Sequence, residues 1–327
     1  MSRLADPSLL DGAVERAVLD GHDGRSGAAL ERVLLDDGTR LVVKRARPGA
    51  DLTMQLSGDS EGRELVLWAT GVLDHLPDGV GHAVVGGWRD GADVVIAMRD
   101  LGGAVLGWDT VLGRDDCRRI FEAAAALHAA FAGRRIEGLC PLSTRLSIFD
   151  PAGLRSLPLD GHPIAGSALR GWERFAELVP AAVADAVAAL HRDPAPLVRA
   201  LTARGTTLVH GDLWLVNAAF EPGRVTLLDW NLATEAPGAF DFTTFLMGAS
   251  GVGATSDELL DDVRAAQGDR HDETALRLAL LASVVDLGWN KALDAADHDD
   301  ADIRARAAAE LAWWADQARR TLDLGLL

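Results

Sequence analysis

The sequence predicts an α+β fold in two lobes, a small antiparallel-sheet lobe over residues 1–102 and a larger, mainly helical lobe over 103–327. Strand-like runs around short turns dominate the first hundred residues, whereas helical periodicity dominates after Gly102-Gly103. At roughly 150 residues per domain, a chain of 327 residues is also long enough for about two such units. With 48% hydrophobic and 25% charged residues, the composition is that of a globular protein with a sizeable core.

The small lobe is expected to contain two hairpins and one inserted helix. Each hairpin is predicted because two apolar runs flank a short turn that ends in glycine. The first pair of runs is 28–35 with 39–44, and the second is 80–88 with 93–98. Apolar residues at helical spacing predict the inserted helix over 60–74. The same spacing predicts a further helix over 7–20 ahead of the sheet, with Pro7 in its first turn.

The large lobe is expected to be a set of helices interrupted by one strand–loop–strand segment. Helices are predicted over 115–132, 166–190, 194–203, 256–267, 271–294 and 300–323. The prolines and glycines of 133–165 predict irregular structure, and 206–230 is the strand–loop–strand segment. A ligand site is expected between the two lobes, because clefts between such units commonly bind small molecules.

Composition excludes several classes of partner. A net charge of −17 argues against DNA or RNA, which require a basic face, and favours a neutral or cationic small molecule. Two cysteines, Cys117 and Cys140, are too few for a disulfide framework or a four-ligand metal site, as expected in a reducing cytosol. The start of the chain has no apolar signal-peptide core, and the most apolar helical stretch, 276–287, is too short to span a membrane. We therefore expect a cytoplasmic protein without a membrane partner, and the sequence specifies no oligomeric state.

Residues 208–230 contain the most informative pattern of polar side chains. An apolar run ends in His210-Gly211-Asp212, as expected for a buried strand that leads into an exposed turn. A second hairpin follows, and if Phe220 pairs with Val225, then Asn217 pairs with Leu228 and Asp229 comes one residue later. Opposed residues in a ladder lie about 5 Å apart, so Asn217 and Asp229 are expected to share one small cavity.

These residue types at this spacing favour phosphoryl transfer. An amide oxygen and a carboxylate, here Asn217 and Asp229, are ligands suited to Mg²⁺, which also binds phosphate oxygens. Asp212 lies five residues before Asn217, close enough to accept the proton of a hydroxyl nucleophile. Any one of these residues alone is as well explained by a hydrogen-bonded turn, but the ordered set is not.

The segment resembles the aminoglycoside phosphotransferase family, the kinase-like phosphotransferases that include choline, fructosamine, homoserine and maltose kinases. The family's catalytic loop, His-Gly-Asp-x-x-x-x-Asn, occurs at 210–217, and its strand ending in Asp-Trp occurs at 227–230. The resemblance implies a protein-kinase-like fold, with Asp212 as catalytic base and Asn217 and Asp229 as ligands of Mg²⁺. It further implies that His210 and Asp241 order the catalytic loop.

The resemblance also predicts a lysine on the third strand, where it would contact the inner phosphates of ATP. Lys44 occupies this place and is one of only two lysines in the chain. A glutamate on the following helix is expected to hold the lysine. Glu64 is preferred because it directly precedes the periodic run of the helix, and Glu61 is the alternative.

Two further segments are candidates for nucleotide contacts. The glycine-containing loop 21–27 leaves backbone N–H groups accessible to phosphates, and we assign Ser26 and Gly27 to this role. In the family, the place of 96–101 is the hinge where adenine binds, so Met98, Asp100 and Leu101 are assigned to the base. An ordinary loop and an ordinary core strand remain the alternatives.

The function predicted is an ATP-dependent phosphotransferase that moves the γ-phosphoryl group to a hydroxyl of an aminoglycoside, sugar, amino sugar or amino alcohol. A protein kinase and a catalytically silent nucleotide-binding module are the main alternatives. A hydrolase is disfavoured because the sequence has no Gly-x-Ser-x-Gly elbow and no zinc-ligand spacing. The acidic residues around 257–262 and 294–300 are either solvated helix faces or a surface that attracts a cationic substrate.

Overall fold

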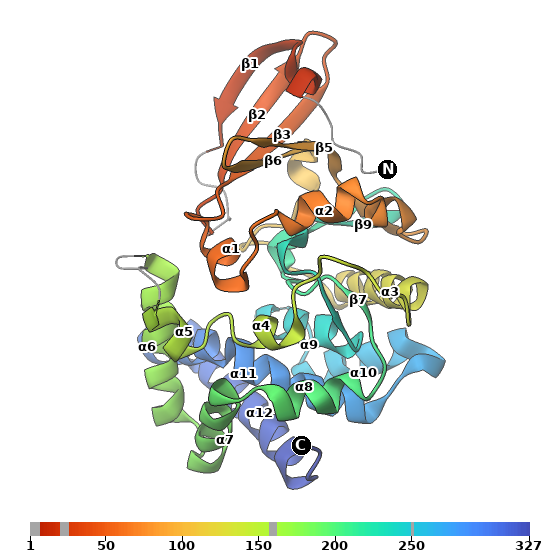
Figure 1. Ribbon diagram of the computed structural model, residues 1–327. Helices are drawn as coiled ribbons and strands as arrows, with labels where there is room; N and C mark the ends of the chain where they lie inside the picture. Colours follow the sequence, from red (N-terminus) through yellow and green to blue (C-terminus); the bar gives the residue numbers. More distant parts are fainter. Residues whose placement is uncertain (1–6, 20–25, 157–161, 250–251) are drawn as a thin grey trace.

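The computed structural model describes residues 7–19, 26–156, 162–249 and 252–327. A twisted sheet with its helices lies above a larger group of helices, as Figure 1 shows. Within the described ranges, no helix combines the length and apolar character that crossing a membrane requires. The predicted two-lobed α+β architecture is confirmed.

The upper sheet has five antiparallel strands in the order β1-β2-β3-β6-β5. Its members are β1 (Ala13–Val18), β2 (Ala29–Leu35), β3 (Arg40–Ala46), β5 (Val84–Asp90) and β6 (Asp93–Arg99). Both predicted hairpins form, β2 with β3 and β5 with β6. Gly38 and Gly91 adopt positive φ in the two turns, which explains why glycine ends each of them.

The predicted helix over 7–20 is wrong. This segment forms a short 3₁₀ turn, η1 (Pro7–Leu10), followed by the edge strand β1, which pairs with β2. Val14 and Val18, two of the residues at helical spacing, are 63% and 72% exposed, so their spacing does not mark a buried helix face. Pairing with β2 supplies the backbone hydrogen bonds that a helix would otherwise make.

The described part of the small lobe contains two α-helices rather than the one predicted. The additional helix, α1 (Leu52–Ser57), is only six residues long and begins at Asp51, whose side chain accepts a hydrogen bond from the N–H of Met54. The predicted helix over 60–74 is α2 (Arg63–Ala69) followed by η2 (Val72–His75), with Gly71 at positive φ between them. Helices this short leave almost no periodic signal in a sequence.

The predicted strand over 80–88 is also two elements. Its first part, β4 (Val80–His82), is not part of the upper sheet and pairs in parallel with β9. Gly81 permits this approach, because a Cβ at that position would lie 2.7 Å from Oγ1 of Thr226 on β9. β4 precedes the predicted lobe boundary, so one strand of the first lobe is hydrogen-bonded to the second.

The second lobe contains ten α-helices in the described ranges. They are α3 (Arg114–Phe131), α4 (Leu142–Leu146), α5 (Pro151–Ser156), α6 (Pro163–Leu178), α7 (Ala181–Arg192), α8 (Ala195–Thr202), α9 (Ala239–Gly248), α10 (Ser256–Gln267), α11 (Glu273–Asp297) and α12 (Ala301–Asp323). The predicted helix over 166–190 is two helices, because Pro180 ends the hydrogen-bonding pattern after α6. Residues 133–165, predicted to be irregular, contain α4, α5 and the start of α6.

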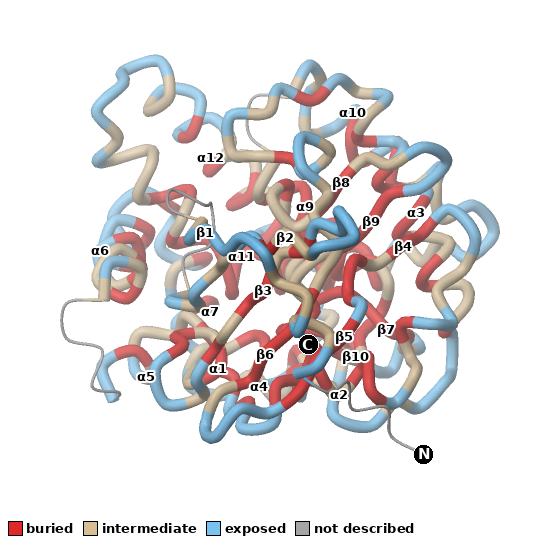
Figure 2. The backbone as a smooth tube through the Cα atoms, turned by 90° about the horizontal axis from the view of Figure 1, so that it is seen from above, coloured by how far each residue is buried: buried red, intermediate tan, exposed pale blue. Residues whose placement is uncertain are grey.

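Short strands connect these helices to the site. β7 (Thr207–Val209) pairs with β10 (Thr234–Ala236), and β8 (Ala218–Glu221) forms a hairpin with β9 (Arg224–Leu227). Four 3₁₀ turns complete the fold, η3 (Gly102–Ala104), η4 (Leu215–Asn217), η5 (Trp230–Leu232) and η6 (Gly268–Arg270). Figure 2 shows that buried residues gather toward the middle of the molecule and exposed residues toward its outer loops.

One hydrophobic core runs through both lobes. It joins Leu65 and Val84 of the upper lobe to Phe121 and Leu280 of the helical lobe. A separate small cluster, which includes Val33 and Trp88, lies in the upper sheet. The most buried long helix is α11, which packs on α6, α9 and α12.

The close packing of α6 on α11 predicts opposite effects for two Gly→Ala substitutions in α6. A Cβ on Gly171 would lie 2.3 Å from the backbone oxygen of Trp289, so Gly171→Ala forces the helices apart and should cost about 1–3 kcal/mol of unfolding free energy. A Cβ on Gly166 meets nothing closer than 3.6 Å, so Gly166→Ala should gain about 0.5–1 kcal/mol. Urea denaturation of the two variants measures the difference, and equal stability would contradict the packing described.

Candidate active site

The hairpin that carries the polar residues has the predicted register. Phe220 is paired with Val225, and the N–H of Leu228 donates to the carbonyl of Asn217 over 2.8 Å. Asn217 and Asp229 both line one cavity, as their spacing predicted.

Asp229 has an unusual backbone conformation at the end of β9. It has φ 61° and ψ 67°, and it is the only non-glycine residue with positive φ in the described part of the chain. Such conformations cost energy and concentrate at functional sites. The conformation accompanies a direct contact between the Asp229 carboxylate and Lys44, with 2.7 Å between Oδ1 and Nζ.

Lys44 lies on β3 between two carboxylates. Its Nζ is 3.6 Å from Oε2 of Glu64 on α2, whereas Glu61 is exposed and lies near Arg89 instead. The structure therefore pairs Lys44 with Glu64 rather than with Glu61. Burial alone would lower the pKa of the Lys44 ammonium, but Asp229 and Glu64 outweigh it and raise that pKa. Burial raises the pKa of Glu64, and the positive charge of Lys44 opposes this.

A cavity of about 340 Å³ lies between the sheet and the hairpin. Its walls include Lys44, Glu64, Asn217 and Asp229, together with the predicted nucleotide contacts Ser26, Met98, Asp100 and Leu101. Gly27 is not part of the wall, although its neighbours Ser26 and Ala28 are. Residues 21–25 of the predicted phosphate loop lie outside the described residues. The cavity is within the size range of small-molecule sites.

Asp212 lies beside this cavity rather than in its wall. Nδ2 of Asn217 donates to the backbone oxygen of Asp212 over 2.9 Å and to its Oδ2 over 3.0 Å. Burial raises the pKa of the Asp212 carboxyl to about 7, with Arg145 opposing the shift and Asp229 adding to it. A carboxylate with this pKa is suited to accept a proton near neutral pH.

A buried carboxylate on α9, Asp241, holds the loop that carries Asp212. It accepts hydrogen bonds from the backbone N–H groups of His210 and Gly211, each over 2.8 Å, and from Nε2 of His128 over 2.9 Å. Burial alone would raise the pKa of Asp241, but the hydrogen bonds from His128 and from the backbone N–H of Gly211 help to bring that pKa below its ordinary value. Gly211 has φ 79°, and a Cβ there would lie 2.0 Å from the oxygen of Leu232. Only glycine fits at this position.

His210 is fully buried at the base of the same loop. Its Nε2 donates to the carbonyl of Leu228 over 2.9 Å, and its ring packs against Trp230. Burial lowers the pKa of His210, which favours the neutral imidazole. His210 therefore connects the loop to the end of β9 through hydrogen bonding and packing.

Sequence reasoning missed a buried cation next to the loop. Arg145 on α4 is 0% exposed, donates from Nε to the carbonyl of Gly211 over 2.6 Å, and has its Nη2 4.0 Å from Oδ1 of Asp212. Its Nη1 donates to Asp286 on α11 over 2.5 Å. Asp286 had a sequence signal, an acidic residue inside the apolar stretch 276–287, whereas Arg145 lies in a segment without periodicity.

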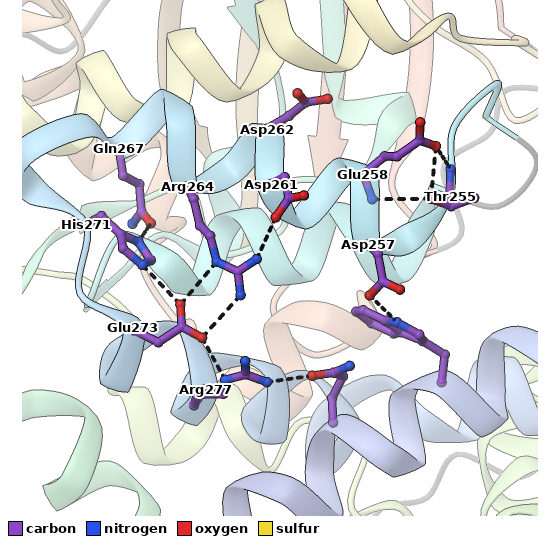
Figure 3. A network of polar contacts seen from close by, with 12 residues as sticks. Thr255, Asp257, Glu258, Asp261, Asp262, Arg264, Gln267, His271, Glu273 and Arg277 are labelled. Atoms are coloured by element: carbon purple, nitrogen blue, oxygen red, sulfur yellow. Dashed lines mark hydrogen bonds and ion pairs between the residues drawn. The ribbon is translucent and has the colours of Figure 1, made fainter.

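The acidic residues of α10 are engaged within the chain. Figure 3 shows Asp261 with Arg264, Glu258 with Thr255, and Asp257 with an indole. That indole belongs to Trp313, and Asp262 pairs with Arg114 and Arg118. None of these carboxylates lines the cavity that contains Lys44. The structure thus favours a self-paired helix face over a surface that attracts a cationic substrate.

The donor set of the cavity fits a hard divalent cation that arrives with phosphate. Within the described ranges, no three His, Cys, Asp or Glu side chains are grouped as a metal site. Asn217 and Asp229 provide an amide oxygen and a carboxylate. Among the described residues, the hydrogen bonds of the Asn217 side chain use Nδ2 and leave Oδ1 to a ligand. Mg²⁺ commonly takes only one or two protein ligands and completes its shell with phosphate oxygens and water.

The two-lobed fold and this site define a protein-kinase-like phosphotransferase of small molecules. The model of the phosphotransferase enzyme family matches residues 23–281, so the chain belongs to that family. No curated protein sequence matches the chain.

Solved structures share the fold at low sequence identity. Choline kinase LicA from Streptococcus pneumoniae has 11% identity and a TM-score of 0.56, with 94% of this chain and 95% of that chain covered. LicA in complex with AMP has 15% identity, a TM-score of 0.53 and the same coverage. An aminoglycoside phosphotransferase from Alicyclobacillus acidocaldarius has 16% identity and a TM-score of 0.52, with 100% of this chain and 96% of that chain covered.

The hydrogen bonds of Asp241 predict a measurable loss on Asp241→Asn. The amide nitrogen of Asn cannot accept a hydrogen bond, so one buried donor of His128, His210 or Gly211 loses its partner, at a cost of about 1–3 kcal/mol. Asp193→Asn is the control, because exposed Asp193 accepts from one N–H only and Asn can still do so. Chemical denaturation compares the two, and a loss for Asp241→Asn no larger than for the control would contradict this role.

Proposed function

We propose that this protein transfers the γ-phosphoryl group of ATP to a hydroxyl of a small molecule, with Asp212 as the catalytic base. The observation that carries the proposal is a continuous set of contacts. Asp212 is hydrogen-bonded to Asn217, and Asn217 lines the cavity in which Asp229 contacts Lys44. The set thus connects a proton acceptor to a cavity with a buried ammonium group.

The cavity is proposed as the ATP site, so that residues 1–102 form the nucleotide-binding lobe and 103–327 the lobe with the catalytic loop and the acceptor site. Met98 and Leu101 would contact the base, and Asp100 holds the turn after β6 by accepting from the N–H of Gly102. Ser26 and Gly27 lie just before β2, where they would cover phosphates. LicA, which shares the fold, has been solved in complex with AMP, which supports nucleotide binding by this protein.

Lys44 is proposed to bind the inner phosphates. It is buried on a rigid strand and already faces two carboxylates, so its charge is held in place by Glu64 and Asp229. Asn217 and Asp229 would hold Mg²⁺, which would supply positive charge to the phosphates during transfer. Positioning and charge neutralisation account for most of the rate in such reactions.

Asp212 is proposed to accept the proton of the acceptor hydroxyl as it attacks. Its carboxylate is held by the amide of Asn217, and its pKa, raised by burial to about 7, suits proton transfer at neutral pH. The acceptor class is proposed to be an amino alcohol or amino sugar, because the net charge of −17 favours a cationic molecule. The choline kinase and aminoglycoside phosphotransferase that share the fold act on molecules of this kind.

A screen for ATP consumption tests the overall proposal. Aminoglycosides, sugars and amino alcohols are each incubated with the protein, ATP and Mg²⁺, and ADP release and phosphorylated product are measured. We expect one acceptor class to stimulate ADP release and to carry the phosphate on a hydroxyl. Transfer to peptides only, or nucleotide binding without any transfer, would contradict the proposal.

Asp212→Asn should reduce turnover by about 10²–10⁴-fold, the usual contribution of a general base. The change keeps the shape of the side chain and removes its ability to take a proton, so nucleotide affinity should change less than about twofold. Steady-state kinetics and calorimetric ATP binding measure the two effects. Asp115→Asn on α3 is the control, because its carboxylate is 91% exposed. Turnover close to that of the unsubstituted protein would remove Asp212 from the role of base.

Asp229→Ala should abolish the contribution of Mg²⁺ to ATP binding. The substitution removes a proposed metal ligand and also frees Lys44 from its 2.7 Å contact, so metal-free ATP should bind at least as tightly as before. Calorimetric titration with ATP in Mg²⁺ and in EDTA separates these two effects. If Mg²⁺ strengthens ATP binding to the variant as much as to the unsubstituted protein, Asp229 is not a metal ligand.

A further inference from the structure

Arg145 joins three separate segments of the helical lobe. Its guanidinium group donates to the carbonyl of Gly211 in the catalytic loop and to the carboxylate of Asp286 on α11, and Arg145 itself lies on α4. The third arm, Nη2, lies 4.0 Å from Oδ1 of Asp212. A guanidinium is planar and its donors have a fixed geometry, so the position of one arm determines the position of the others.

Stability does not explain why this ion pair is buried. Both side chains are 1% exposed, and Oδ1 of Asp286 is buried with no hydrogen-bond partner in the described structure. Removing two charges from water is costly, and a buried ion pair is often no more stabilising than apolar side chains of the same volume. A pair that is incompletely hydrogen-bonded is therefore better explained by what it holds in place.

The pair of Arg145 and Asp286 holds the backbone of Gly211, which directly precedes the proposed base Asp212. The carbonyl of Gly211 accepts from Arg145, and the N–H of Gly211 donates to Asp241. Both polar backbone groups of the residue before Asp212 are thus bound by buried side chains. Residues 208–217 contain no lysine or arginine, so any cation near Asp212 has to come from another segment.

We infer that Arg145, oriented by Asp286, is a positioning residue for phosphoryl transfer, which fixes Gly211 and keeps the carboxylate of Asp212 aimed at the acceptor hydroxyl. This inference rests on the proposed role of Asp212. A displacement of about 1 Å at a reacting group can cost on the order of 10²-fold in rate, so loss of the pair should lower turnover without altering nucleotide affinity.

The test replaces the pair with apolar side chains, Arg145→Met together with Asp286→Leu, so that no unpaired buried charge remains. A matched control is Lys291→Met with Glu310→Leu, because Lys291 is also buried on α11 and forms a 2.5 Å ion pair with Glu310 on α12. For each protein we measure the melting temperature, ADP release from Mg·ATP with water as acceptor, the KM for ATP, and amide hydrogen exchange of 208–217.

We expect the Arg145/Asp286 variant to melt close to the unsubstituted protein, to lose at least tenfold in turnover at unchanged KM, and to exchange faster at 208–217. The control should change neither turnover nor exchange. Turnover within twofold of the unsubstituted protein, or unchanged exchange, overturns the inference.

Two further variants keep the inference testable. If the double variant does not fold, Arg145→Lys retains the charge and loses the planar fork, and it should show the same loss of turnover at unchanged KM; turnover within twofold overturns the inference. Asp212→Asn is measured in parallel. Full turnover in Asp212→Asn contradicts the proposed function, whereas the exchange of 208–217 still decides whether Arg145 holds the loop.

Discussion

The site depends on the burial of a negative charge, the carboxylate of Asp241, beneath the catalytic loop. A carboxylate removed from water must be satisfied by donors, and here two of the three donors are consecutive backbone N–H groups, those of His210 and Gly211. Two consecutive amides can turn toward one acceptor only if the chain bends sharply. Gly211 makes this bend at positive φ, pressed against Leu232. The following residue, Asp212, is therefore held in a fixed position by a rigid turn.

The catalytic loop is also rigidly connected to the cavity proposed for the nucleotide. His210 binds the carbonyl of Leu228, so the catalytic loop is connected to the end of β9 where the backbone turns at Asp229. The register of the β8–β9 hairpin then places Asn217 between Asp212 and the cavity. On the loop side the carboxylate of Asp212 lies 4.0 Å from Nη2 of Arg145, and at the upper sheet Lys44 lies between Asp229 and Glu64. Each charge has an opposite charge as its neighbour, which allows several to be buried together.

The sequence predicts the structure best where interactions between residues that are close in sequence determine it. Short turns set the register of the hairpin at 217–228, so the pairing of Asn217 with Leu228 followed from counting residues. The segment at 13–18 was mispredicted because its apolar spacing resembles a helix, while strand pairing with β2, a contact distant in sequence, determines its structure. The pair of Arg145 and Asp286 was missed for the same reason, because the two residues are 141 positions apart and only the packing of α4 on α11 joins them. Local patterns thus predicted the register around Asn217, and the resemblance added His210 and Asp241 as residues that order the loop, but neither indicated the buried pair of Arg145 and Asp286.

The pairing of β4 with β9 constrains how the two lobes move. β4 is part of the upper lobe by sequence, yet its ladder with β9 ends one residue before Leu228, in the wall of the cavity. A bidentate ion pair between Arg99 on β6 and Glu221 on β8 adds a second contact between the two lobes. Sliding of one lobe over the other would break this ladder, whereas rotation about it would not. A rotation about this ladder would displace Asp229, two residues after the ladder ends, less than it would displace parts of the cavity that lie farther away.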